Sequence, residues 1–335
     1  MFSEMNDMRY FIVGLLWICL PLFANAQEGD DGYAFLRFPT SSRINALGGY
    51  SVSLVESDPS LVFHNPALLG GEMDNRLNVN YMNYISDVNV GSVAFTKAFR
   101  ERSAWGIGAT CMNYGNMKEM TVNNEQLGVF SVQDIGLHVF YSYDLSEKWR
   151  GGLSMKALYS TLADYSSFGL AVDAGLSYFD AESDFSFGLA LKNVGAQLKA
   201  YDDERQRIPW DLQLGVTKRM AYAPIRLSVT AMYLNRWEFE YIDKTAESND
   251  SFLETALKHL VFGVEFLPTE NVWLGVGLNP KTKMDMTLAS GNTLGGFTIG
   301  GGVKVSRFAI NASVARFHPS ATSFMISLAL ALSEF

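Results

Sequence analysis

The sequence predicts an all-β fold, an antiparallel transmembrane β-barrel of about 14 strands with a short N-terminal plug segment before the first strand. Three observations predict it. Apolar residues alternate with small or polar ones from residue 77 onward, the alternating segments run about ten residues, and tryptophans lie at segment ends. A tilted strand needs roughly ten residues to cross a bilayer, whereas strands of soluble sheets average about five or six. The pattern therefore favours strands that face lipid on one side.

The first segment, residues 1–26, has the layout of a secretory signal peptide. Arg9 precedes an apolar stretch over residues 11–23, and the small-x-small triplet Ala-Asn-Ala follows at 24–26. This layout predicts cleavage after the triplet and a mature chain that begins at Gln27. An uncleaved membrane anchor is the alternative interpretation.

Composition and charge exclude several classes of protein. The chain is 48% hydrophobic and only 18% charged, which is too apolar for a disordered protein. Its formal net charge is −9, and the signal segment carries one basic and two acidic residues, so the mature chain has a net charge of −8. No basic surface for nucleic acid is predicted. Cleavage also removes Cys19 and leaves Cys111 alone, so no intramolecular disulfide can form.

Residues 27–76, between the signal segment and the first strand, carry helix and turn signals. In "FHNPALLGG", Asn65 is suited to cap a helix, Pro66 to its first position, and Ala67 to the turn that follows. Gly48 and Gly49 allow a tight backbone turn. Because the lumen of a barrel this wide is not closed by its own side chains, we expect this segment to pack inside as a plug.

Residues 77–335 form the predicted barrel. In residues 149–159, apolar side chains occupy one parity, and Gly, Ser, Lys and Arg occupy the other, as expected for a lipid face and a lumen. Trp273 lies on the lumen parity, and the other four mature tryptophans lie on the lipid parity. The predicted strands lie near 77–85, 88–99, 103–114, 130–143, 147–161, 166–179, 184–192, 210–219, 225–237, 258–267, 271–279, 296–305, 307–317 and 323–334.

The connections between these segments differ in length by position. Every even-numbered connection is short, and the four long ones are odd-numbered: 115–129, 193–209, 238–257 and 280–295. Bacterial barrels have short periplasmic turns and longer outer loops. The split predicts that the even-numbered turns face the periplasm.

No catalytic, cofactor or metal site is predicted. The four histidines are far apart, no metal-ligand spacing occurs, and no nucleophile elbow precedes a helix. His138 lies on the lumen parity of its strand, which favours a polar lumen residue over a catalytic one. The glycine-rich stretch 295–302 follows no strand-to-helix pattern and is not a phosphate loop.

The segment "FLRFPTSSRINALGGYSVSLVESDPSLVFHNPALLG", residues 35–70, resembles the start of the PorV/PorQ branch of FadL-like outer-membrane proteins. The strand-loop phrase "FGLALKNVGAQL" at 187–198 is also typical of that branch. The length of the mature chain is most similar to PorQ proteins of the type IX secretion system of Bacteroidetes. This resemblance implies an outer-membrane anchor, set among outer-membrane lipid and lipopolysaccharide, that holds a PorZ-like surface protein of the cargo attachment complex.

Two loops are candidates for contact with such a partner. Loop 238–257 combines acidic residues with Phe239, Tyr241 and Phe252, and aromatics often dominate interfaces. Loop 193–209 is charged and is the second candidate. Two alternatives stay open: a FadL-type transporter of small hydrophobic molecules and a PorV-like cargo shuttle. A transporter needs a continuous apolar pocket beside the plug, whereas the lumen parity here is mainly Gly, Ser and charged residues, which favours an anchor.

We predict that the mature protein begins at Gln27 and fractionates with the outer membrane, because a cleavage triplet precedes lipid-facing strands. Amino-terminal sequencing of the protein from separated membranes tests both points. An intact first segment, or recovery in a soluble fraction, would contradict the prediction.

Overall fold

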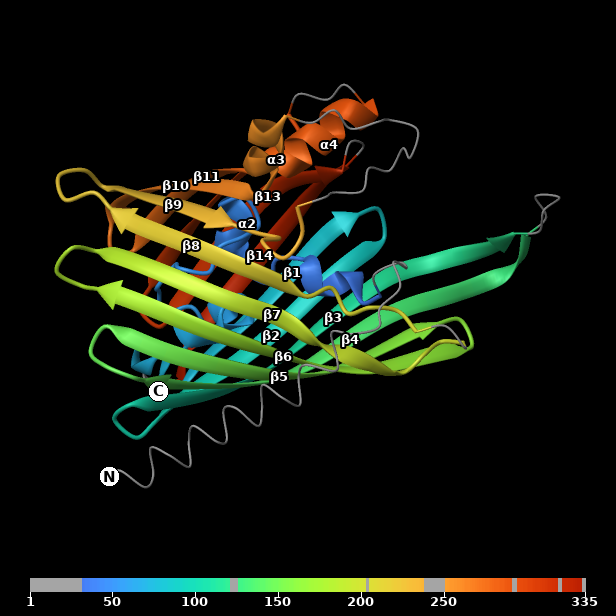
Figure 1. Cartoon of the computed structure of the whole chain (residues 1–335), viewed down its shortest axis with the longest axis horizontal. Helices are drawn as coiled ribbons and strands as arrows, with labels where there is room; N and C mark the ends of the chain where they lie inside the picture. The colour runs from blue at the N-terminus through green and yellow to red at the C-terminus, as the bar shows by residue number, and fades with distance from the viewer. Residues whose placement is uncertain are drawn as a thin grey trace.

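The structure is a computed structural model that describes residues 32–120, 126–202, 205–237, 251–290, 294–318 and 321–332. Over these residues the chain forms a closed antiparallel barrel of 14 strands with short helical elements inside it (Figure 1). The predicted fold class is therefore confirmed. The predicted signal segment 1–26 lies outside the described residues.

Each strand pairs with its chain neighbours, and β1 pairs with β14 to close the barrel, with Arg76 opposite Ala331. A closed barrel leaves no unpaired strand edge. The strands are β1 (Arg76–Ile85), β2 (Val88–Phe99), β3 (Ser103–Met120), β4 (Gln126–Asp144), β5 (Trp149–Leu162), β6 (Tyr165–Asp180), β7 (Phe185–Lys199), β8 (Asp211–Arg219), β9 (Ile225–Ala231), β10 (Leu260–Thr269), β11 (Val272–Leu278), β12 (Phe297–Val305), β13 (Phe308–His318) and β14 (Ala321–Ala331).

Two predicted outer loops are partly strand, which corrects the sequence analysis. Most of loop 115–129 extends the hairpin of β3 and β4, and the beginning of loop 193–209 belongs to β7. Gly115 (φ 75°) and Asn193 (φ 59°), the first residues of the two predicted loops, lie where the strand register shifts. They are bulges inside paired strands and do not end them.

The other two long connections contain helices. α3 (Phe252–Lys258) precedes β10, and α4 (Pro280–Ser290) follows β11. A capping box between Ser251 and Glu254 starts α3. Strand β9 ends at Ala231, six residues before its predicted end. Among the described residues, no helix is long and apolar enough to span a membrane.

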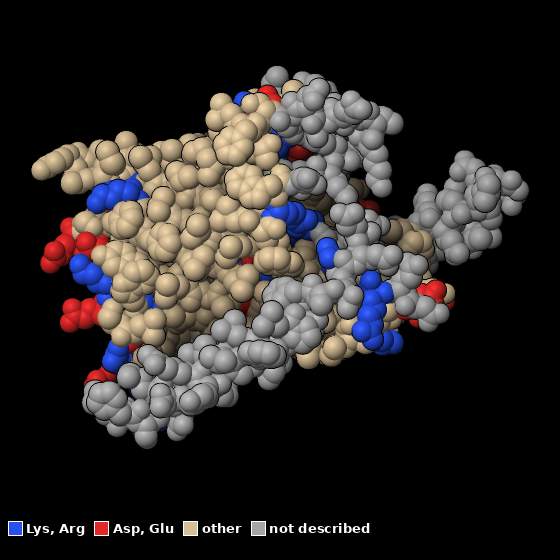
Figure 2. All heavy atoms as spheres, viewed as in Figure 1, with Lys and Arg blue, Asp and Glu red and all other residues tan. Residues whose placement is uncertain are grey.

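The outer wall of the barrel is apolar. Met155 and Leu153 of β5 are 68% and 51% exposed, whereas their neighbours Ser154 and Lys156 point inward and are buried. On the face that Figure 2 shows, charged side chains gather toward the two ends of the barrel. This distribution is the one that a barrel in a bilayer requires.

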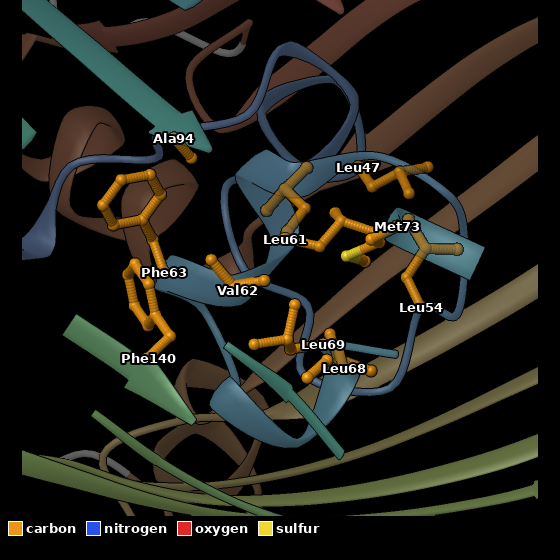
Figure 3. Packing of buried hydrophobic residues seen from close by; sticks show 12 residues of the cluster. Leu47, Leu54, Leu61, Val62, Phe63, Leu68, Leu69, Met73, Ala94 and Phe140 are labelled. Atoms are coloured by element: carbon orange, nitrogen blue, oxygen red, sulfur yellow. The ribbon is translucent and has the colours of Figure 1, made fainter. Parts of the chain in front are cut away.

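The N-terminal segment occupies the lumen. It contains η2 (Ala34–Arg37), α2 (Ser42–Ala46), η3 (Pro59–Phe63), η4 (Pro66–Leu68) and η5 (Gly71–Met73). Its apolar side chains form a buried cluster that includes wall residues of β2, β3 and β4 (Figure 3). The members are Ile44, Leu47, Leu54, Leu61, Val62, Phe63, Leu68, Leu69, Met73, Ala94, Ala104 and Phe140. We call residues 32–73 the plug.

Inward glycines let the plug backbone lie directly on the wall. A Cβ at Gly188 would be 2.0 Å from the carbonyl oxygen of Val52, and one at Gly277 would be 2.2 Å from the backbone nitrogen of Gly48. Side chains at these positions would overlap the plug. The glycines of the lumen face therefore serve close packing and do not line an open lumen.

We predict that Gly188→Ala displaces the plug from β7, because the added methyl group would overlap the Val52 carbonyl. The expected cost is about 1–3 kcal/mol of folded-state stability. Limited proteolysis of the plug and the thermal midpoint on heat-modifiability gels measure it. Gly91→Ala is the matched control, because a Cβ there meets no atom closer than 3.8 Å. Equal behaviour of the two variants would contradict the packing argument.

Candidate functional site

The predicted Asn-Pro-Ala turn starts a single 3-10 turn inside the lumen. Asn65 Oδ1 accepts from the backbone N–H of Ala67 at 2.9 Å, and Pro66 occupies the first position of η4. Asn65 Nδ2 also donates to the carbonyl oxygen of Val52 at 2.8 Å, which ties two plug segments together. The turn packs over Gly152 and Gly175 of β5 and β6.

The Gly48-Gly49 turn lies against a different wall. Both glycines have left-handed backbone conformations, with φ of 95° and 88°. The backbone N–H of Gly48 donates to Thr298 Oγ1 of β12 at 2.9 Å. The two parts of the predicted plug motif therefore fasten the plug to separate sides of the barrel and do not form one site.

Four charged residues join the plug to β9 and β10. Arg43 Nε donates to Glu265 Oε1 at 2.7 Å, and Arg226 Nε donates to Glu265 Oε2 at 2.6 Å. Glu56 lies 3.2 Å from Arg43 Nη2 and 2.8 Å from Arg226 Nη1. Two plug residues and two wall residues thus form one alternating network of charges. We call it the Arg43 network.

The network keeps the carboxyl of Glu56 ionised. Burial alone would raise the pKa of the Glu56 carboxyl, but the guanidinium groups of Arg43 and Arg226 outweigh it and lower the pKa to about 2. Glu56 is therefore ionised at neutral pH. Arg43 also lies over the ring of Trp273, 5.0 Å from its centroid. This contact explains why Trp273 lies on the lumen parity.

The two lumen histidines are buried structural groups. Nε2 of His64 accepts from the backbone N–H of Thr40 at 3.3 Å. Burial lowers the pKa of His64 well below its usual range, and the ammonium groups of Lys192 and Lys156 lower it further, so the ring is neutral. His138 Nε2 lies 3.1 Å from Thr110 Oγ1. Among the described residues, no three His, Cys, Asp or Glu side chains are placed to share a metal ion.

The described cavities lie at the two ends of the lumen, with the plug between them. At the end of the long loops, a cavity of about 270 Å³ has an aromatic lining of Phe38, Tyr50, Tyr84, Tyr233 and Phe317. At the end of the short turns, cavities of about 280 and 380 Å³ lie beside the plug, and both have charged linings. The first is lined mainly by aromatic side chains, and the other two have more charged residues in their linings.

The structure places one of the three predicted partner-contact aromatics. Phe252 begins α3 and is 79% exposed, and its ring stacks on that of Trp237 with centroids 6.2 Å apart. Leu253 beside it is also exposed. Phe239 and Tyr241 lie outside the described residues. We call Trp237, Phe252 and Leu253 the outer aromatic surface.

The Arg43 network was not predicted from the sequence. A signal for it was present, because Arg226 and Glu265 are charged residues on the lumen parity of their strands. Such charges need a partner inside the barrel. The alternation could not say that the partners are Arg43 and Glu56, which lie about 200 residues away in the chain.

We predict that Asn65→Ala costs about 1 kcal/mol or more, because the change removes the cap of η4 and the bond to Val52. Hydrogen exchange should accelerate over residues 63–71 and stay unchanged in the strands. Asn83→Ala, in β1 at the loop end, is the control that should leave the plug protected. A variant that no longer forms the barrel would place the turn in assembly instead.

Comparison with known proteins identifies the fold. No protein-family model matches the chain, and no curated protein sequence matches it. Among solved structures, a FadL homologue of Pseudomonas aeruginosa is similar with a TM-score of 0.54 and 12% identity, over 87% of this chain and 98% of that one. The toluene transporter TodX of Pseudomonas putida gives a TM-score of 0.51 and 11% identity, over 85% and 95%. The monoaromatic hydrocarbon channel CymD gives a TM-score of 0.51 and 12% identity, over 88% and 96%. The chain therefore has the fold of FadL-like 14-stranded outer-membrane barrels.

Proposed function

We propose that this protein is an outer-membrane barrel that anchors a surface partner, in the manner of the PorQ proteins that hold a PorZ-like component of the type IX attachment complex. The apolar outer wall supports insertion in the outer membrane after export. The observation that carries the proposal is the packing of the plug, which fills the lumen between the cavities at its two ends.

The free energy stored in the plug argues against a passage. The lumen cluster holds eight fully or nearly fully buried plug side chains of Leu, Ile, Val or Met type. Burial of one such side chain stabilises the folded state by about 1.5–3 kcal/mol. Moving the plug aside would expose several of them and would also separate the Arg43 network. The cost is on the order of 10 kcal/mol, so at equilibrium only about one molecule in 10⁷ would have its plug displaced.

The outer aromatic surface supports the second half of the proposal. Trp237, Phe252 and Leu253 are exposed at the end of the long loops, beyond the last residues of β9 and before β10. Aromatic side chains commonly carry most of the energy of a protein interface. A partner at the cell surface would meet this end of the barrel first.

A FadL-type transporter of small hydrophobic molecules is the second candidate. The aromatic cavity at the loop end has the apolar lining that such a ligand needs. The similar solved structures include a toluene transporter and a hydrocarbon channel, although likeness of fold does not carry function. This candidate requires an apolar path out of that cavity, past the plug or through a lateral gap in the barrel wall. A PorV-like cargo shuttle would use the loop end as the anchor does, but would release its partner.

We predict that Phe252→Ser with Leu253→Ser releases a surface protein into the medium, while the barrel stays folded, because the changes remove exposed apolar contacts and no lumen contact. Mass spectrometry of the medium identifies the released protein. Tyr222→Ser is the matched control, since Tyr222 is a fully exposed aromatic in the short turn before β9.

A locked plug separates the two candidates. Ser53 Oγ and Thr217 Oγ1 are 2.8 Å apart, so Ser53→Cys with Thr217→Cys, in a Cys111→Ser background, should permit a disulfide between plug and β8. An anchor should keep its partner when the plug is locked. The transporter would be established instead by two results together. The oxidised form would lose function and recover it with reductant, and the changes in the outer aromatic surface would release no partner.

A further inference from the structure

One cavity at the short-turn end is rich in positive charge. Its volume is about 280 Å³, and it lies between the plug and the ends of β8 to β14. Five cationic side chains line it, against three acidic ones. The cations are Arg43, Arg76, Arg219, Arg226 and Lys304, and the acids are Glu56, Asp58 and Glu270.

Pairing inside the Arg43 network leaves part of this charge uncompensated. Arg43 and Arg226 are balanced by Glu56 and Glu265. In the part of the chain that the structure describes, the remaining cations, Arg76, Arg219 and Lys304, form no ion pair within 4.0 Å. Asp58 Oδ1 is already used by Ser60 and Asn78. Asp58 and Glu270 remain to offset these three cations, so the cavity keeps a surplus of one positive charge.

A buried donor in the cavity lacks a partner. Arg226 is only 9% exposed, and its Nε and Nη1 donate to Glu265 and Glu56. Its Nη2 is buried and has no hydrogen-bond acceptor. An unsatisfied buried donor of a charged group costs about 1–3 kcal/mol, so such groups usually bind something. Arg226 lines the cavity, and a small shift of its side chain would bring Nη2 to a ligand there.

We propose that this cavity binds a phosphate group, with Arg226 Nη2 as the buried donor and Arg76, Arg219 and Lys304 as the cations that compensate its charge. Guanidinium groups match phosphate oxygens in shape and charge. Four separate cationic groups outnumber the two acceptor oxygens of a carboxylate. Their number fits the three or four oxygens of a phosphate. The mouth of the barrel can meet a free phosphate or the headgroup of a phospholipid.

The test uses the full mature chain folded in non-ionic detergent, with inorganic phosphate as the probe and sodium chloride holding the ionic strength constant. A ligand that binds only the folded state raises the thermal midpoint by mass action. We expect a saturable rise of about 3 °C at phosphate concentrations far above the dissociation constant. Arg219→Gln with Lys304→Gln should weaken binding at least about tenfold, the loss that follows from removing two charge-assisted contacts.

Lys148→Gln is the matched control. Lys148 lines the neighbouring cavity at the same end and pairs with Asp180 at 2.9 Å, so its loss should leave phosphate binding unchanged. Nanodiscs with and without phosphatidate distinguish the two sources: a midpoint raised by phosphatidate, and lost in the double variant, assigns the site to a lipid headgroup. The proposal is overturned if phosphate gives no saturable rise, if the double variant responds like the parent, or if polyglutamate binds where phosphate does not.

Discussion

The close approach of the plug backbone to the glycines of the wall is the contact on which the rest of this structure depends. A 14-stranded barrel is too wide for its own side chains to fill, and a bilayer requires every strand to pair. Gly152, Gly188 and Gly277 let backbone lie against backbone at separate points around the lumen. Because the plug touches opposite walls at once, it acts as a filler of the barrel, and its apolar core closes the lumen.

The Arg43 network restricts the position that the plug can take in the lumen. A buried ion pair gives little net stability, but removal of one partner leaves an uncompensated charge that costs about 3–5 kcal/mol. Glu265 accepts hydrogen bonds from Arg43 of the plug and from Arg226 of β9. The charges of the wall are therefore fully paired only when the plug is in place. Apolar packing alone would tolerate a shifted plug, whereas the network allows a single seating.

The barrel could be predicted from the sequence, whereas the contacts that hold the plug in the lumen could not. Alternation with a period of two fixes which side chains face lipid, so all 14 predicted strands are present in the structure. Two loops were predicted to begin at Gly115 and Asn193, where the strands continue through bulges, and only the partner strand distinguishes a bulge from a turn. The cap at Asn65 joins residues that are close in the sequence, so it could be predicted. The bonds from Arg43 to Glu265 and from Gly48 to Thr298 join positions more than 200 residues apart, and no local pattern encodes such pairs.

The same contacts bear on how proteins that share a fold can have different functions. A FadL-like barrel can carry molecules only if the filler of its lumen can leave a path, and the energy that holds the filler decides this. Here a buried apolar cluster and a network of four charged residues hold the plug in place, and separating either one alone would leave the other opposing the movement. The aromatic cavity at the loop end can receive a ligand, yet it ends at the plug. A barrel built in this way has an aromatic cavity at the loop end and two charged cavities at the short-turn end, and function is then a matter of what each end binds.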